Sequence, residues 1–404
     1  MKKFCYSFFC FAFLSLSGFG QNVWTQKSDV GGLTRRNAVG FSIGSKGYIG
    51  LGYSDTTASM LKDFWEYSPL SDSWTQIADF GGTARYSATA FAIGHFAYVG
   101  MGADQNSPYH FNKDFWKYDP AGNAWTSISD FPGTARYQCK AFTLGAKGYI
   151  GTGWNQLSLF SDFWEYDPSI DSWSQKATFP GLAREASTAF SVSGFGYMGL
   201  GLGSAGAFND IYKYDAGLNT WSAVADFPSI NFDPVSFVIG NIAYVGTGSS
   251  TYPNLNLTNH FWQYNPDSNS WSAIPDMGGT KRLSAVSFAI DSFGYCGTGG
   301  YGTATYNLGD LWQYGPSGVG ISEIKNNLNV SVFPNPANKF VNFHLTSFEP
   351  GETLVITDIH GRKIYADVIK SQDYSLALST WSSGVYFYII HSDKGSAVGK
   401  IVKE

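Results

Sequence analysis

Five arginines stand at one position of a repeating pattern, and they are the side chains best suited to bind a charged ligand. A guanidinium group holds a carboxylate through two parallel hydrogen bonds, so a ring of such groups would attract an anion. The alternative is that each arginine ties its repeat to a neighbour through backbone carbonyls and through acidic groups of the adjoining loops. Those acidic residues are Asp79, Asp130, Asp226 and Glu185. The repeated residues are Arg35, Arg85, Arg136, Arg184 and Arg282, with Asn231 in the fifth copy.

Aspartates recur as well, but their positions argue against a metal site. Each begins an expected strand in the outer half of a repeat, where carboxylates lie too far apart to share an ion. We expect them to cap turns instead. Three histidines of the repeat region, His95, His110 and His260, occupy unrelated positions. Neither a metal nor a cofactor is predicted. The repeated aspartates are Asp63, Asp114, Asp162, Asp210 and Asp310.

Aromatic side chains in the loops near the arginines form the second group of candidate ligand contacts. Trp154 is the tryptophan that the repeat does not account for, and Tyr109 and Tyr252 lie in comparable loops. Aromatic rings beside arginines suit stacking on a sugar or clasping a peptide. Because aromatic residues are abundant throughout the chain, packing of these rings against the rim is the alternative explanation.

Composition favours an all-β chain. Of its 404 residues, 17% are aromatic and only 14% are charged, and there are 47 glycines, as suits many short strands joined by tight turns. The formal net charge of −5 supplies no basic surface, so nucleic acid is not an expected partner. No nucleophile elbow, phosphate loop or zinc-binding helix motif is present, so no catalytic residue is assigned and enzymatic activity stays open.

An internal repeat of about 50 residues defines the fold. Each copy holds a Gly-x-Gly pair, a five-residue string related to Asp-Phe-Trp-Glu-Tyr, and a second tryptophan that follows an expected hairpin. Each copy therefore reads as four strands of one antiparallel sheet. The strings lie at 63–67, 114–118, 162–166, 210–214, 260–264 and 310–314.

The two ends of the repeat region predict how it closes. The sixth copy stops at Tyr314 without its second tryptophan, whereas the region starts with an unmatched outer strand around Trp24. That strand should complete the last sheet and remove its exposed edge. The paired glycines, the following aromatic residue and the closing tryptophan resemble the kelch motif, although kelch glycines are adjacent. The resemblance covers 21–316 and implies a six-bladed kelch-type β-propeller closed by the N-terminal strand.

The first twenty residues have the layout of a secretory signal peptide. Lys2 and Lys3 precede a short apolar run, and small residues precede Gln21. We therefore expect 1–20 to be removed and the mature chain to lack a transmembrane segment. The mature chain keeps Cys139 and Cys296, which we expect to be packed thiols because a disulfide would have to cross the propeller.

Beyond an expected linker at 317–327, residues 328–404 predict a small β-sandwich of about seven strands. The segment contains a spaced set of residues, Pro334, Asn335, Pro336, Gly361, Gly384 and Tyr386. With these positions it resembles the type A sorting domain of the bacterial type IX secretion system. The resemblance implies the type IX machinery as a partner, and a secreted or outer-surface location in a Gram-negative bacterium of the Bacteroidetes type. The alternative is an ordinary adhesion module.

Together these observations predict a monomeric propeller that acts as a non-catalytic binding module for a glycan or a protein. The alternative is a carbohydrate-active enzyme of the six-bladed kelch type, similar to a sugar-acid epimerase or an oxidase. Galactose oxidase has a kelch propeller, but no residue of this chain matches its copper site.

Overall fold

The computed structural model describes residues 22–104, 110–301, 306–316, 330–346, 348, 352–359, 362–392 and 395–404. The expected signal peptide and linker, Tyr109 and Gly361 lie outside these described residues. The described residues form an all-β structure of strands and turns, so none of them belongs to a helix that could cross a membrane. The chain divides into two compact units, Met1–Ser317 (unit 1) and Gly318–Glu404 (unit 2).

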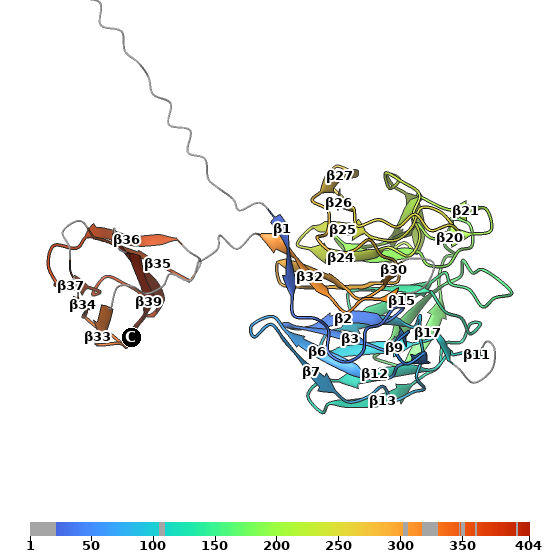
Figure 1. Ribbon diagram of the computed structural model, residues 1–404, viewed down its shortest axis with the longest axis horizontal. Coiled ribbons are helices and arrows are strands. Elements are labelled where there is room, and N and C mark those ends of the chain that lie inside the picture. Colours follow the sequence, from blue (N-terminus) through green and yellow to red (C-terminus); the bar gives the residue numbers. More distant parts are fainter. Residues whose placement is uncertain are drawn as a thin grey trace, which may run out of the picture. The chain divides into compact units, whose positions relative to one another are not determined.

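The described residues of unit 1 form six antiparallel four-stranded sheets, numbered here in chain order (Figure 1). In sheets 1 to 5 the four strands follow one another along the chain, apart from short two-stranded hairpins that are described below. The strands of these five sheets are β2 (Val39–Ile43), β3 (Lys46–Gly50), β6 (Phe64–Ser68) and β7 (Ser73–Ile77); β8 (Thr89–Ile93), β9 (Phe96–Gly100), β12 (Phe115–Asp119) and β13 (Ala124–Ile128); β14 (Lys140–Leu144), β15 (Lys147–Gly151), β16 (Phe163–Asp167) and β17 (Ser172–Gln175); β18 (Thr188–Val192), β19 (Phe195–Gly199), β22 (Ile211–Asp215) and β23 (Thr220–Ala223); and β24 (Val235–Ile239), β25 (Ile242–Gly246), β26 (Phe261–Asn265) and β27 (Ser270–Ile274).

Sheet 6 joins the two ends of unit 1. It consists of β28 (Val286–Ile290), β29 (Phe293–Gly297), β32 (Leu311–Pro316) and β1 (Asn22–Lys27). In Figure 1 the blue strand β1 lies beside the orange strand β32, and Trp24 is paired with Tyr314. The indole of Trp24 donates a hydrogen bond to the carbonyl of Pro275, 2.9 Å away, as the outer-strand tryptophans of the other sheets do toward their preceding sheets.

Backbone hydrogen bonds link the sheets in a cycle. The second glycine of each Gly-x-Gly pair donates to the carbonyl at the arginine position of the next sheet, as from Gly52 to Arg85 at 2.9 Å. The sixth such bond runs from Gly299 back to Arg35, also at 2.9 Å. The innermost strands contact one another in the same order, and β28 contacts β2. These six glycines have positive φ, as +91° at Gly102, which is why glycine recurs there.

Aromatic residues fill the space between neighbouring sheets. Within each sheet a phenylalanine of the first strand stacks on a tyrosine of the second, as Phe91 does on Tyr98 with ring centroids 5.2 Å apart. The hairpins before the outer strands place Asp72 and Asn123 at positive φ, which these residues tolerate. Cys139 and Cys296 are free and buried, as expected, and burial raises the pKa of their thiols to about 11 and about 12.

Short two-stranded hairpins extend the loops at one end of unit 1. They follow the Gly-x-Gly pairs of sheets 1, 2, 4 and 6. These hairpins are β4 (Tyr53–Ser54) with β5 (Ser59–Met60), β10 (Ala103–Asp104) with β11 (His110–Phe111), β20 (Leu202–Gly203) with β21 (Gly206–Ala207), and β30 (Gly300–Tyr301) with β31 (Tyr306–Asn307).

Unit 2 consists of two antiparallel sheets that share one core. One sheet has the order β33-β34-β37 and the other β36-β35-β38-β39. Val341 and Phe343 of the first sheet are buried with Leu354 and Ile390 of the second. The strands among its described residues are β33 (Val330–Phe333), β34 (Phe340–Leu345), β35 (Thr353–Thr357), β36 (Lys363–Val368), β37 (Asp373–Ala377), β38 (Gly384–Ser392) and β39 (Gly395–Lys403).

Candidate functional site: the loop end of unit 1

The five repeated arginines are buried in ion pairs. Arg85 is 1% exposed, and its two terminal nitrogens donate to Oδ1 and Oδ2 of Asp114 at 2.6 and 3.0 Å. The same guanidinium donates to the backbone carbonyls of Thr83 and Met101, both at 3.1 Å. The pairs are Arg35–Asp63, Arg85–Asp114, Arg136–Asp162, Arg184–Asp210 and Arg282–Asp310.

These partners differ from the expected ones in two ways. The carboxylates are the repeated aspartates, rather than Asp79, Asp130, Asp226 or Glu185, and they bind arginine instead of capping turns. The side-chain pair also lies within one repeat, because Arg85 precedes the first strand of sheet 2 and Asp114 precedes its third. The backbone of the arginine position makes the link to the neighbouring sheet.

The ion pairs favour the charged form of four of the aspartates. Burial by itself raises the pKa of Asp114, but the hydrogen bonds and positive charge of Arg85, with a further hydrogen bond from the Trp116 indole, outweigh it and lower that pKa. The pKa values of Asp63, Asp162 and Asp310 are lowered in the same way. Aromatic rings cover several of the guanidinium groups, since Arg136 lies 3.7 Å from the ring centre of Phe160.

The predicted aromatic contacts occupy different environments. Trp154 is half-buried, and its ring lies 5.8 Å from that of Tyr137, while the backbones of the two residues form a bridge. Tyr252 is 68% exposed and meets Phe232 edge-on at 6.3 Å. The structure therefore brings Trp154 and Tyr252 to the same loop end but into contact with different residues.

The residues immediately after the arginine position form the mouth set, which sequence reasoning missed. Each pairs by a backbone bridge with the residue that follows its sheet's Gly-x-Gly pair, so all six extend the inner strands at the loop end. A position that follows the repeated arginine but changes from copy to copy is a signal in the sequence that could have identified this set. The mouth set is Arg36, Tyr86, Tyr137, Glu185, Phe232 and Leu283.

Three members of the mouth set carry distinct chemistry. Tyr86 and Tyr137 meet edge-on at 5.9 Å, and Phe111 stacks on Tyr137 at 5.4 Å, which extends the aromatic group to Trp154. The guanidinium of Arg36 lies 5.0 Å from the ring centre of Tyr53.

Glu185 is the acidic member of the mouth set. Burial, together with the nearby charge of Asp233, raises its pKa to about 7. Its Oε2 atom is buried without a hydrogen-bond partner among the described residues. Asp233 accepts a hydrogen bond from the hydroxyl of Ser284 at 2.6 Å and lies 3.8 Å from the ammonium of Lys140.

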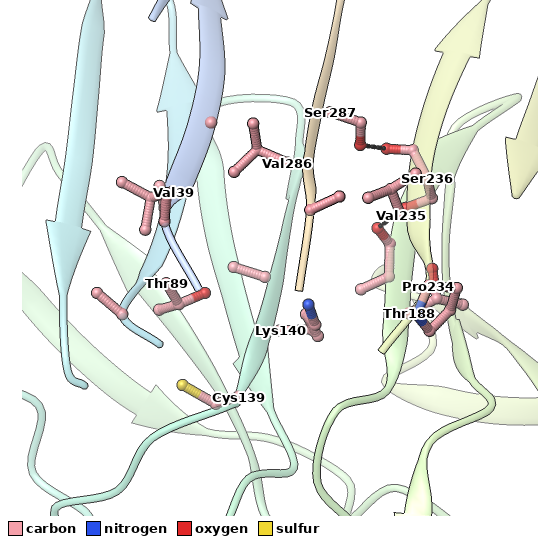
Figure 2. A pocket seen from close by; sticks show the side chains of 17 residues that line it. Val39, Thr89, Cys139, Lys140, Thr188, Pro234, Val235, Ser236, Val286 and Ser287 are labelled. Atoms are coloured by element: carbon pink, nitrogen blue, oxygen red, sulfur yellow. Dashed lines mark hydrogen bonds between the residues drawn. The ribbon is translucent and has the colours of Figure 1, made fainter. Parts of the chain in front are cut away.

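A narrow cavity of about 140 Å³ runs between the innermost strands (Figure 2). Residues of all six innermost strands line it, and most are alanine, valine, serine or threonine. Lys140 supplies the one charged side chain among the described residues of its wall, and Figure 2 shows it between Thr89 and Thr188. A cavity this small admits a few water molecules rather than a sugar or a peptide.

The described sorting-motif residues hold the end of unit 2 together. The Asn335 amide donates to the carbonyl of Lys400 at 2.7 Å and accepts from the backbone of Val402 at 2.8 Å. Tyr386 is buried, and its hydroxyl donates to the Ser382 carbonyl at 2.8 Å. Pro334 and Pro336 flank Asn335, and Gly384 begins β38.

Comparison with known families identifies this unit. Residues 331–404 match the family model described as the secretion system C-terminal sorting domain. The chain ends in a type IX secretion sorting domain. This domain indicates a secreted or cell-surface protein of a Bacteroidetes-type bacterium and names the type IX machinery as a partner.

Unit 1 is recognised by structure rather than by sequence. No curated protein matches the chain. The solved structure of YjhT is similar with a TM-score of 0.60 and 17% sequence identity, over 70% of this chain and 96% of YjhT. At this identity the likeness speaks for the fold alone, and it supports a β-propeller-like fold for unit 1.

Proposed function

We infer that unit 1 is a closed six-bladed kelch-type β-propeller that acts, once exported, as a non-catalytic binding module for a glycan or a protein. Three observations support closure: the cycle of backbone bonds that returns from Gly299 to Arg35, the cyclic contacts of the innermost strands, and the pairing of β1 with β32. The repeat region then serves as a rigid frame, because the positions that recur in each sheet are occupied by buried ion pairs and stacked aromatic rings.

The observation that carries a binding role is the mouth set. Its members differ from sheet to sheet although they stand beside repeated residues. They include Tyr86, which is half-buried, and Tyr137, which is buried and supports the half-buried ring of Trp154. Rings that expose one face while packing through the other supply contact area at low entropic cost. Sugar rings and extended peptides both present the apolar and polar edges that such a surface accepts.

The five buried arginines belong to the frame in this proposal. Their guanidinium groups use their donors on aspartates and backbone carbonyls, and at most 1% of each residue is exposed. Arg36 is the arginine of this end that retains exposure, with 26% of its side chain accessible beside Asp55. It, rather than the buried ring, would meet an acidic group on a ligand.

A glycan array probed with the secreted protein, together with a peptide array, tests this function. We expect Trp154→Ala to remove binding, because it deletes half of the Tyr137–Trp154 pair. Leu218→Ala is the matched control, since Leu218 is 73% exposed at the hairpin between β22 and β23, away from the loop end. Binding that survives Trp154→Ala and Tyr86→Ala alike would contradict the placement of the site.

Glu185 favours a second candidate function, a carbohydrate-active enzyme. A half-buried carboxyl with its pKa raised to about 7 is poised to exchange a proton near neutral pH, as a general acid or base requires. Incubating the protein with candidate sugars and following epimerisation by NMR tests it. Turnover that disappears in Glu185→Gln, while array binding persists, would establish the enzyme and displace the non-catalytic proposal.

A further inference from the structure

Sheet 5 departs from the other five sheets at two positions at once. Asn231 replaces the repeated arginine, and His260 replaces its aspartate partner. Both members of the ion pair are replaced, so neither charged group remains without its partner. The loop before Asn231 also changes, because Ser229 stands where the other copies have a glycine beside the guanidinium. A coordinated departure of this kind removes a structural element and frees the space that it occupied.

A cavity of about 300 Å³ lies at this place. Its wall includes Phe227, Ser229, Asn231, His260 and Trp262. Phe227 corresponds to phenylalanines that lie under a guanidinium elsewhere, as Phe80 does at 5.0 Å from Arg85, but Phe227 has no such cation among the described residues. The volume falls at the lower end of the range for small-molecule sites, which suits one ring-sized ligand rather than a polymer.

Two polar groups of this wall have lost the partners that the repeat provides. Trp65, Trp116, Trp164 and Trp312 each donate an indole hydrogen bond to the repeated aspartate, at 2.6 to 2.8 Å. The indole of Trp262 cannot make this bond, because His260 stands in place of the aspartate. Its N–H is therefore open to an acceptor from water or from a ligand.

Asn231 presents the opposite requirement. It is 3% exposed, and its Nδ2 donates to the carbonyl of Thr247 at 2.8 Å, which fixes the orientation of the amide. Its Oδ1 is left without a donor among the described residues. Asn231 belongs to the cavity wall, so a ligand hydroxyl that reaches Oδ1 would supply the missing donor, and a ligand oxygen would accept from the Trp262 indole.

The charges around the cavity favour a neutral ligand. Its wall includes Lys281, which is exposed, and His260, whose Nδ1 lies 2.7 Å from Asp276 outside the wall. A cation would find no carboxylate among the described wall residues, and an anion would face the Asn231 carbonyl oxygen. We propose that the sheet 5 cavity, formed where Asn231 and His260 replace the repeated ion pair, binds a neutral monosaccharide unit against Phe227 and Trp262. This deepens the proposed function and rests on its glycan branch.

Tryptophan indole resonances of the intact ¹⁵N-labelled protein provide the test, with glucose, galactose and mannose titrated to millimolar concentrations. The resonance that disappears in Trp262→Phe identifies this indole. We expect at least one sugar to shift it. Isothermal titration calorimetry, which does not depend on the Trp262 resonance, should show that Trp262→Phe weakens binding of that sugar about tenfold, which corresponds to one lost hydrogen bond. Tyr212 occupies this position in sheet 4, so a smaller aromatic ring is compatible with the fold.

The matched control is Trp164→Phe, the same change in sheet 3, where the indole binds Asp162. It should leave the sugar titration unchanged. The double substitution Asn231→Arg with His260→Asp restores the repeated ion pair, fills the cavity and should abolish the shift. A Trp262 resonance that no neutral sugar moves, a titration unchanged in the double variant, or a response confined to glucuronate would overturn this inference.

The outcomes separate this site from the mouth set. Array binding that is lost in Trp154→Ala but retained in the double variant removes the sheet 5 site and leaves the proposed function intact. Array binding lost only in the double variant supports the sheet 5 site and contradicts the placement of the main site at the mouth set.

Discussion

Replacing Arg85 by alanine should cost unit 1 about 3 kcal/mol of unfolding free energy, at the lower end of the range for breaking a buried ion pair. The substitution removes the Arg85 donors of the Asp114 carboxylate and of the Met101 carbonyl, although Asp114 keeps the hydrogen bond from the Trp116 indole. It also uncovers the ring of Phe80. The upper end of the range is not expected, because 31% of the Asp114 side chain is accessible and water can solvate part of the freed charge.

Sheet 5 contains a natural replacement of the ion pair, which serves as a reference for this substitution. Arg85→Asn combined with Asp114→His reproduces the pair found at Asn231 and His260. Because this double variant leaves no unpaired carboxylate, it should be more stable than Arg85→Ala alone, although the single change removes fewer groups. Lys113→Ala changes an exposed charge next to Asp114 and should stay within about 0.5 kcal/mol of the parent protein.

Urea unfolding followed by tryptophan fluorescence measures these differences for unit 1, because every tryptophan except Trp381 lies in 22–316.

The pH dependence of the unfolding free energy gives an independent check. Since the folded state lowers the pKa of Asp114 below its ordinary value of 3.8, the pair contributes fully above that value and is lost as pH falls toward the folded pKa. Arg85→Ala should flatten this acid limb. A loss below about 1 kcal/mol with an unchanged acid limb would refute the buried-pair argument.

Three further changes test other parts of the structure. Trp24→Ala should lower unfolding free energy by about 3 kcal/mol, because its ring packs on Phe261 and Tyr314 across the joined ends of unit 1; an unchanged urea midpoint would contradict closure by β1. Gly102→Ala should cost about 2 kcal/mol from positive φ and a close approach to the Tyr86 carbonyl, whereas Gly94→Asn, at open positive φ, should be nearly neutral in the same assay. Deleting 331–404 should leave the protein in the periplasm, and cell fractionation that finds it outside as efficiently as the full chain would refute the export role.

The pairing of β1 with β32 could be predicted because it depends on counting. The last copy of the repeat lacks its second tryptophan, and the region begins with an unmatched one. The simplest arrangement is that the first strand completes the last sheet, and the pairing of Trp24 with Tyr314 agrees with it. The positive φ of Asp72 and Asn123 was similarly accessible, since hairpin chemistry is local.

The arginine partners could not be predicted from proximity along the chain. Arg85 and Asp114 are 29 positions apart, with two strands and a variable loop between them, whereas Asp79 is close in sequence. Which carboxylate meets the guanidinium depends on how the first and third strands of a sheet start at the same end. The replaced ion pair of sheet 5 could not be predicted for the same reason. Asn231 and His260 are far apart in the sequence, and only the structure shows that the corresponding residues of the other sheets form one pair.

The pairing of β1 with β32 also fixes the order in which unit 1 can be completed. The strand β1 is synthesised first of all the strands, and its partner is synthesised last in unit 1. Until β32 has emerged, β1 has no edge to join, and its contacts span nearly the whole unit, which makes this step a late one in folding. The sorting domain follows β32 in the chain. By the time the sorting domain has been synthesised, β32, the strand that pairs with β1, has therefore already been synthesised.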